Sequence, residues 1–123
     1  MVKLVFVIRR REDLSPEEFH RYWLEEHGPL ARRLLDSLGA RRYVQTHTLD
    51  TDVNTQQAGT RETAEAFDGL AEVWWDSLDA LLAAAGSEAG QSANETLTED
   101  EARFIDFERS SFFIAEEHAI LER

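Results

Sequence analysis

The chain has 123 residues, with 25 acidic and 13 basic side chains and a formal net charge of −12. So acidic a chain repels phosphate, which argues against nucleic acid and anionic membrane surfaces as partners. It contains no cysteine, which excludes disulfides, thiolate metal sites and a cysteine nucleophile, and no apolar run approaches the roughly 20 residues that cross a bilayer. We expect one soluble, cytoplasmic domain over residues 1–123.

The first part of the chain predicts a strand, a long helix and a second strand. Residues 2–8 (VKLVFVI) are nearly all apolar and rich in β-branched residues, as in a strand covered on both faces. A capping box with a proline in the first turn begins a helix at residues 15–18, and Gly39 ends it. Pro29 predicts a kink or a restart within this helix. Residues 41–49 form a second strand of mixed polarity.

The second part predicts a long polar segment followed by strand, helix, short helix and strand. Residues 50–68 show no sustained period, which is typical of a functional lid or a disordered loop. Residues 69–75 form a strand, and Asp76 or Ser77 caps a helix that ends at Gly86. The pattern TEDE at residues 98–101 is a second capping box, which predicts the start of a short helix before the last strand.

This order, β-α-β-β-α-β, is the split βαβ arrangement of ferredoxin-like folds. It predicts an α+β architecture in which two helices cover one face of a four-stranded antiparallel sheet and leave the other face bare. The first strand is apolar on both faces, so the sheet face that the helices leave bare is also apolar and must be covered. A second copy of the chain is the simplest cover, and we expect a homodimer whose two sheets pack face to face.

His27 is the first candidate for chemistry. It follows Trp23 by four residues and therefore lies on the same helix face as Trp23 and Phe19, pointing toward the sheet. Two interpretations stay open: a core histidine held by one backbone hydrogen bond, or a general acid or base in a pocket between helix and sheet.

A second group follows from alternation along the second strand. Tyr43, Gln45 and His47 point to one side of that strand, as in a ligand site or a dimer-interface network. Glu72 shares a face with Trp74 on the third strand, so this carboxylate is either paired with an arginine or chemically perturbed.

The tryptophans add broad apolar surface, and two interpretations of it also stay open. Trp23, Trp74 and Phe19 serve core and dimer packing, or they line a pocket for a flat or greasy molecule. His20 and His27 stand about 10 Å apart along a helix, too far for one ion, and the sequence has no glycine-rich phosphate loop or serine elbow. We expect neither a metal nor a cofactor.

Several motifs together resemble those of the EthD domain family. They are Arg9, Leu14–Phe19, Tyr22–Trp23, His27–Leu30, Tyr43–His47, Phe67–Trp75 and Asp100–Asp106, and the combination W-x-x-x-H-G-P-L with a later D-E-x-x-F-I-D is the most specific part. The resemblance implies a dimeric α+β barrel. It also implies a relation to a protein needed for ethyl tert-butyl ether breakdown beside a cytochrome P450 system, and to isomerases, cyclases, cofactor-free monooxygenases and haem enzymes of the same barrel type.

The leading hypothesis is cofactor-free acid–base chemistry of the isomerase, cyclase or dehydratase type on a small hydrophobic or aromatic metabolite, in a catabolic or polyketide-related pathway. His27 is the acid or base, His47 and Tyr43 orient an oxygen, and Trp23 and Trp74 form the apolar wall, with Phe19, Gln45 and Glu72 completing the substrate site. The segment at residues 50–68 closes the pocket.

Two alternatives accompany this hypothesis. One is a non-catalytic accessory protein that binds a hydrophobic compound for a partner oxygenase. The other is a haem-binding oxidoreductase, as the related barrels allow. Whether the chain is an enzyme at all therefore stays open at this point.

Overall fold

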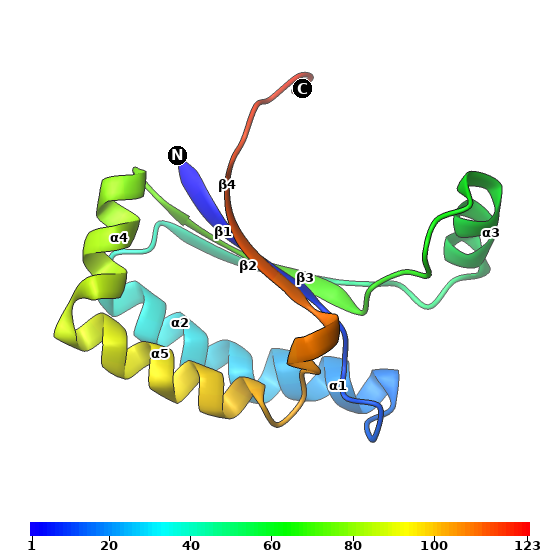
Figure 1. Ribbon diagram of the computed structural model, residues 1–123, viewed down its shortest axis with the longest axis horizontal. Helices are drawn as coiled ribbons and strands as arrows, with labels where there is room; N and C mark the ends of the chain where they lie inside the picture. Colours follow the sequence, from blue (N-terminus) through cyan, green and yellow to red (C-terminus); the bar gives the residue numbers. More distant parts are fainter.

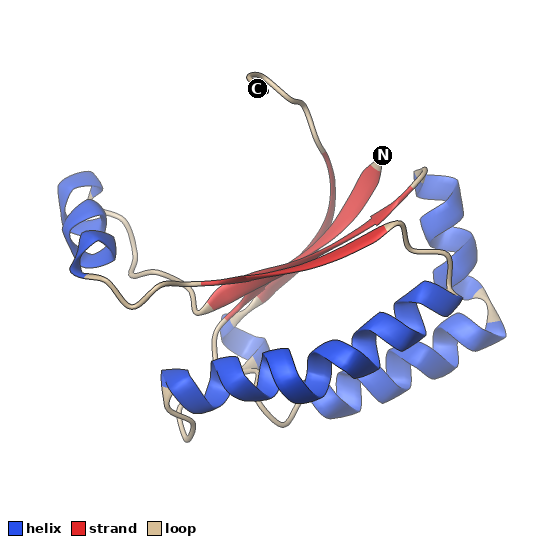
Figure 2. Cartoon of the chain, turned by 180° about the vertical axis from the view of Figure 1, so that it is seen from behind, coloured by secondary structure: helices blue, strands red, loops and turns tan.

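Four antiparallel strands organise the computed structural model, which describes all 123 residues. The strands are β1 (Val2–Ile8), β2 (Arg42–His47), β3 (Gly69–Trp75) and β4 (Ser111–Glu116), in the spatial order β2-β3-β1-β4. This is the predicted ferredoxin-like α+β sheet. Apart from the helix at Asp52–Arg61, the helices gather on one of its faces, and the opposite face is open (Figure 2).

The helix layer consists of two long, roughly parallel rods beneath the sheet (Figure 1). One rod combines α1 (Pro16–Tyr22), the π-helical turn η1 (Trp23–His27) and α2 (Gly28–Ser37). The other is α5 (Glu88–Glu101), which follows the shorter α4 (Leu78–Gly86). The 3₁₀ turn η2 (Phe107–Arg109) leads from this layer into β4. None of the helices combines the length and apolar character of a membrane-spanning helix.

The predicted helix start at residues 15–18 is confirmed. The Ser15 hydroxyl accepts a hydrogen bond from the Glu18 backbone N–H at 3.1 Å, and the Glu18 carboxylate accepts one from the Ser15 backbone N–H at 3.1 Å. Gly39 follows the helix in the left-handed conformation, with φ 81°. Local capping chemistry thus sets both ends of the first rod.

The irregularity expected at Gly28 and Pro29 takes the form of a π turn, after which α2 begins at Gly28 with Pro29 in its first turn. In the π turn the Gly28 backbone N–H donates to the Trp23 carbonyl five residues earlier. Proline has no N–H to give to the carbonyl four residues before it, and a wider turn absorbs this missing bond without breaking the rod. The π turn ends at His27.

Two predictions for the second part of the chain were wrong. Residues 50–68 contain the helix α3 (Asp52–Arg61), which is capped by Thr51 and lies beyond the end of the sheet (Figure 1). The pattern at residues 98–101 ends α5 rather than starting a helix, because Ser87 caps that helix eleven residues before Thr98. Both helices lack a strong apolar stripe, so periodicity gave no signal for them.

The core lies between the first rod and the centre of the sheet. Its largest cluster is aromatic and aliphatic: Phe6, Ile8, Phe19, Trp23, Phe104 and Ile105. A second cluster of Val73, Trp75 and Leu81 anchors α4 to β3. These clusters fix the spacing between helices and sheet, and the candidate site lies in that space.

The open face of the sheet mixes apolar and charged side chains. Lys3 is paired with Glu72, and the Arg42 guanidinium lies 4.7 Å from the centre of the Trp74 ring. Val5 and Phe113 are register partners at the middle of this face. The structure therefore gives this face an apolar centre with an ion pair beside it.

Candidate functional site

A cavity of about 890 Å³ separates the helix layer from the sheet. Of the 29 residues that line it, 21 are hydrophobic, including Phe6, Val73 and Trp75 from the sheet. Among the polar side chains that reach it are His27, Tyr43 and Glu101. An apolar chamber with a few convergent polar groups is the usual form of a small-molecule site.

His27 is held at the wall of this cavity by a carboxylate. The residue is 4% exposed, and its Nδ1 lies 2.7 Å from Asp100 Oδ2. Because a carboxylate accepts hydrogen bonds, Nδ1 carries the proton and Nε2 keeps its lone pair. Burial lowers the pKa of His27, and Asp100 opposes this only in part. The imidazole is thus neutral, oriented and able to accept a proton at Nε2.

Asp100 is itself fixed from two further sides. The Tyr22 hydroxyl donates to Asp100 Oδ1 at 2.5 Å, and Arg103 Nε lies 3.7 Å from the same oxygen. Burial and the hydrogen bond to Asp100 both raise the pKa of Tyr22, so this phenol stays a donor. Asp100 therefore orients His27 in the manner of a carboxylate behind a catalytic imidazole.

Glu101, the next residue along α5, lies on the other side of the imidazole. Its Oε2 is 3.8 Å from His27 Nε2, and the side chain lines the cavity. Burial raises the pKa of Glu101 to about 7, and the neighbouring Asp100 charge adds to the effect. The cavity thus holds a neutral base and a carboxyl that is half protonated near neutral pH.

Tyr43, Gln45 and His47 form a hydrogen-bond chain along β2. Gln45 Nε2 lies 2.9 Å from both the Trp23 carbonyl and the Tyr43 hydroxyl. A backbone carbonyl only accepts, so the amide nitrogen faces it and Gln45 Oε1 faces His47 Nε2 at 2.7 Å. The Tyr43 oxygen accepts from Gln45, which leaves its own proton to donate elsewhere. Burial raises the pKa of Tyr43 and keeps that proton in place.

His47 supports the chain from its outer end. Its ring stacks on Trp23 with centroids 4.4 Å apart and lies 4.7 Å from the ring of His20. Burial and the neighbouring His20 lower the pKa of His47. His47 lies outside the cavity lining, so it reaches the chamber only through Gln45 and Tyr43.

The structure brings some of the predicted site residues together and separates others. Trp23, His27 and Tyr43 line the cavity, whereas Phe19 lies behind Trp23, fully buried, with ring centroids 5.5 Å apart. Glu72 belongs to the opposite face of the sheet, where it is paired with Lys3.

Trp74 is also on the opposite face, because alternation along β3 turns Ala71, Val73 and Trp75 toward the helices. Trp74 therefore forms no wall of this cavity. Residues 50–68 contribute nothing to the lining either, since α3 lies beyond the end of the sheet (Figure 1).

Sequence reasoning missed Tyr22 and Glu101 and gave Asp100 no role. One signal was present: three successive acidic residues, Glu99, Asp100 and Glu101, close the last turn of α5. Negative charge is unfavourable at a helix C-terminus, where the backbone carbonyls already carry partial negative charge. Acidic residues at such a position indicate that their carboxyl groups have a specific interaction partner. For Asp100 and Glu101 that partner is His27.

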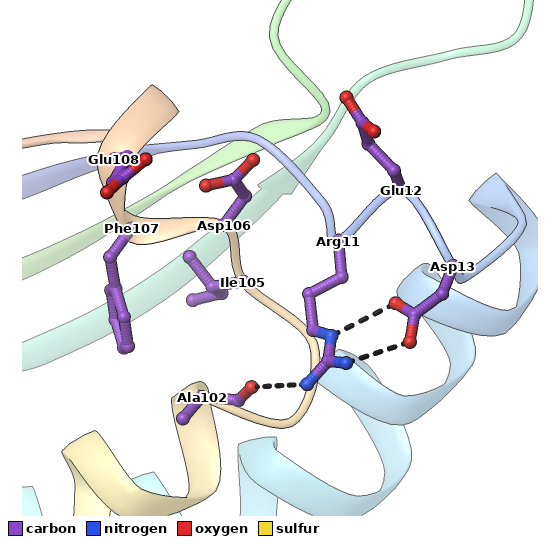
Figure 3. A pocket seen from close by; sticks show the side chains of 8 residues that line it. All are labelled: Arg11, Glu12, Asp13, Ala102, Ile105, Asp106, Phe107 and Glu108. Atoms are coloured by element: carbon purple, nitrogen blue, oxygen red, sulfur yellow. Dashed lines mark hydrogen bonds and ion pairs between the residues drawn. The ribbon is translucent and has the colours of Figure 1, made fainter.

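A second, open hollow lies on the surface beside the start of α1, between residues 11–13 and 102–108 (Figure 3). The Arg11 guanidinium is paired with Asp13 at 2.8 Å and donates to the Ala102 carbonyl at 3.0 Å. These bonds connect the segment before α1 to the end of α5, and the charge of Arg11 is paired with that of Asp13. No group of three or more His, Cys, Asp or Glu side chains is arranged to hold a metal ion.

Comparisons with known proteins agree with this fold. A model of the EthD domain matches residues 11–108. An EthD family protein from Bacillus halodurans is 20% identical, with a TM-score of 0.65 over 96% of this chain and 99% of that one. A dimeric protein of unknown function and ferredoxin-like fold from Bacteroides fragilis is 14% identical, with a TM-score of 0.59 over 94% and 95% of the two chains.

A third similar structure is a variant of SnoaB, a cofactor-independent oxygenase from Streptomyces nogalater. It is 16% identical, with a TM-score of 0.53 over 99% of this chain and 97% of that one. No curated protein matches the chain. At these identities the solved structures establish the shared fold.

Proposed function

Because the chain belongs to the EthD family, we propose that it binds a small hydrophobic or aromatic molecule between its helices and its sheet and transforms that molecule by acid–base chemistry that needs no cofactor. The observation that carries this proposal is the His27–Asp100 pair at the wall of an apolar cavity. A buried, neutral imidazole with a fixed tautomer is suited to remove a proton from a bound substrate.

The remaining groups complete the site. Trp23 offers a flat wall beside the base. The Tyr43 hydroxyl, oriented by Gln45, donates a hydrogen bond to a substrate oxygen and stabilises the charge that develops there. His47 acts as a positioning residue, because it holds the Gln45 amide in the orientation that Tyr43 requires. Isomerases, cyclases and dehydratases share this step of proton removal beside an oxygen.

The test uses neutral flat ketones with acidic C–H bonds: 2-indanone, 2-tetralone and anthrone. In D₂O, NMR follows the exchange of the acidic proton for deuterium with and without protein. We expect the native protein to accelerate exchange and His27→Gln to lose the acceleration, with His118→Gln as control because His118 is exposed. Equal rates for the native protein and His27→Gln refute the assignment of the base.

The same experiment separates catalysis from binding alone. Tryptophan fluorescence reports binding, because Trp23 and Trp75 line the cavity. Binding without accelerated exchange would support an accessory protein that holds a hydrophobic compound for a partner oxygenase. Failure of all three ketones to bind would refute the proposed ligand class.

The open face of the sheet supports a homodimer as part of this proposal. Its apolar centre at Val5 and Phe113 fits a second copy of the same face, and the similar protein from Bacteroides fragilis is described as dimeric. Glu72 and Trp74 then belong to the dimer interface rather than to the substrate site. Light scattering tests this: Phe113→Asp should yield monomers, whereas Val53→Asp on the exposed side of α3 should leave the dimer intact.

A further inference from the structure

The two ring nitrogens of His27 face two successive carboxyl groups at the end of α5. Asp100 lies at hydrogen-bond distance from Nδ1, and Glu101 Oε2 lies 3.8 Å from Nε2. A distance of 3.8 Å is too long for a hydrogen bond between the two groups. It is short enough for one bound substrate to contact both His27 Nε2 and Glu101 Oε2. The imidazole therefore has one carboxyl that orients it and another that shares its reactive side.

The surroundings of these two carboxyls differ. Asp100 has hydrogen bonds from His27 and Tyr22 and lies near Arg103. Glu101 has no such set of donors, and its one ion-pair contact is His27. Burial without a paired cation favours the neutral acid, as its pKa of about 7 reflects. Near pH 7 about half of the Glu101 carboxyl groups therefore retain a proton that they can give away.

We propose that Glu101 is a second catalytic residue, the acid that protonates a substrate oxygen while His27 removes a carbon-bound proton, and that the substrate is a neutral enolisable ketone. This inference rests on the function proposed above and extends it. It assigns a role to a residue on α5, far along the chain from the histidine, and it narrows the ligand from a hydrophobic molecule to a ketone with an acidic α-hydrogen.

The step balances within the site. The C–H bond next to the carbonyl breaks, its proton goes to His27 Nε2, and its electron pair forms the carbon–carbon double bond of the enol. The carbonyl π electrons move to oxygen, which takes the proton from the Glu101 carboxyl. The imidazolium and the Glu101 carboxylate that result lie 3.8 Å apart. Transfer of the Nε2 proton to that carboxylate, directly or through one water molecule, restores both neutral groups.

The charge of the lining determines which ketones fit. The residues that line the cavity include no lysine and no arginine, and their carboxyl groups are Glu95 and Glu101. A carboxylate or phosphate group on the substrate would therefore have no counter-ion in the chamber and would meet negative charge instead. A neutral ketone avoids this cost and accepts hydrogen bonds from Glu101 and Tyr43.

The pH dependence follows from the groups that face Glu101. They are His27 from η1, Tyr43 from β2 and Asp100 from its own helix. The reaction needs His27 neutral and Glu101 protonated. Its rate should rise as His27 loses its proton below the usual imidazole pKa, and fall as Glu101 ionises near pH 7. The profile is a bell whose descending side belongs to Glu101.

The experiment compares Glu101→Gln with Glu99→Gln, an exposed neighbour on the same helix. Deuterium exchange at the benzylic position of 2-tetralone is measured from pH 5 to pH 9. We expect Glu101→Gln to bind 2-tetralone as the native protein does but to exchange it about 100-fold more slowly, the size of a typical general-acid contribution. The descending side of the pH profile should disappear, and Glu99→Gln should match the native protein.

Each outcome bears on one proposal. Native-like exchange and an unchanged bell in Glu101→Gln would overturn the role of Glu101, while loss of exchange in His27→Gln would leave the proposed function standing. Binding of 2-naphthoate as tight as that of 2-tetralone would overturn the preference for neutral ligands. If Glu101→Gln failed to fold, Glu101→Leu, which removes the acid but keeps the bulk, would take its place with the same expected profile.

Discussion

Replacing Gly69 by alanine tests whether the helix layer packs directly on the backbone of β3. A Cβ atom at this position would lie 2.5 Å from the Thr46 carbonyl oxygen of the neighbouring strand. It would also lie 2.6 Å and 2.9 Å from two carbons of the Trp23 indole. Trp23 is 1% exposed and its ring packs against Phe19 and His47, so moving the ring would disturb both contacts. The native residue is glycine because the indole occupies the place of a side chain.

The magnitude follows from these two obstructions. Overpacking a well-filled core costs about 1–3 kcal/mol, and here both a strand carbonyl and a buried ring must yield. We therefore expect Gly69→Ala to lower the free energy of unfolding by about 3 kcal/mol. For a domain of this size, about 4 °C of Tm corresponds to each kcal/mol, so Tm should fall by about 12 °C.

Urea and thermal unfolding followed by circular dichroism measure both quantities. Gly59→Ala is the matched control, because Gly59 lies in α3 with no atom within 4 Å of a built Cβ. Alanine suits a helix interior better than glycine by up to about 1 kcal/mol, so this control should not lower the stability. A Gly69→Ala protein with native Tm would refute the direct packing of Trp23 on β3.

Three further predictions concern the caps and the buried acids. Ser15→Ala should cost about 1 kcal/mol in urea unfolding, because the Glu18 backbone N–H loses its acceptor; an unchanged midpoint would contradict the cap. Folding raises the Glu101 pKa from 4.5 to about 7, so the folded chain binds this proton more tightly and stability should fall by about 3 kcal/mol as pH rises through that window. Urea titrations at pH 4.5 and pH 8 should show this fall as the difference in stability between the native protein and Glu101→Gln, because His27 and His47 act in the opposite direction in both proteins. Asp100→Asn should lower the His27 pKa further, since the carboxylate is what favours the imidazolium; NMR titration of the ring protons checks the direction, and a raised value would refute it.

Local signals in the sequence were sufficient for most of the fold. Continuous apolar runs predicted β1 and β3 with their bounds, and a capping box predicted the start of α1. These features depend on neighbouring residues alone, so they are legible without the structure. The helix α3 was missed because a helix whose side chains are nearly all exposed or half-buried has no apolar stripe to reveal it.

Only the part of the candidate site formed by the first helical rod and β2 was predictable from the sequence. The helical wheel placed His27 toward the sheet, and strand alternation aligned Tyr43 with Gln45, because both periods are local. The partner of His27 lies 73 residues away, at Asp100. Only the packing of two helices brings such residues together, and no pattern within either helix specifies the pair.

The π turn joins the two halves of this site. Pro29 withholds one helical hydrogen bond, and the rod widens into a turn that ends at His27. The same turn begins at Trp23, whose carbonyl also accepts from Gln45 and so fixes the direction of the chain that leads to Tyr43. One irregular turn therefore orients the Gln45–Tyr43 hydrogen-bond chain at its start and places His27 on the cavity wall at its end. An ordinary α-helical turn of the same residues would rotate His27 relative to Trp23, which is a physical reason for a proline in the middle of a long helix.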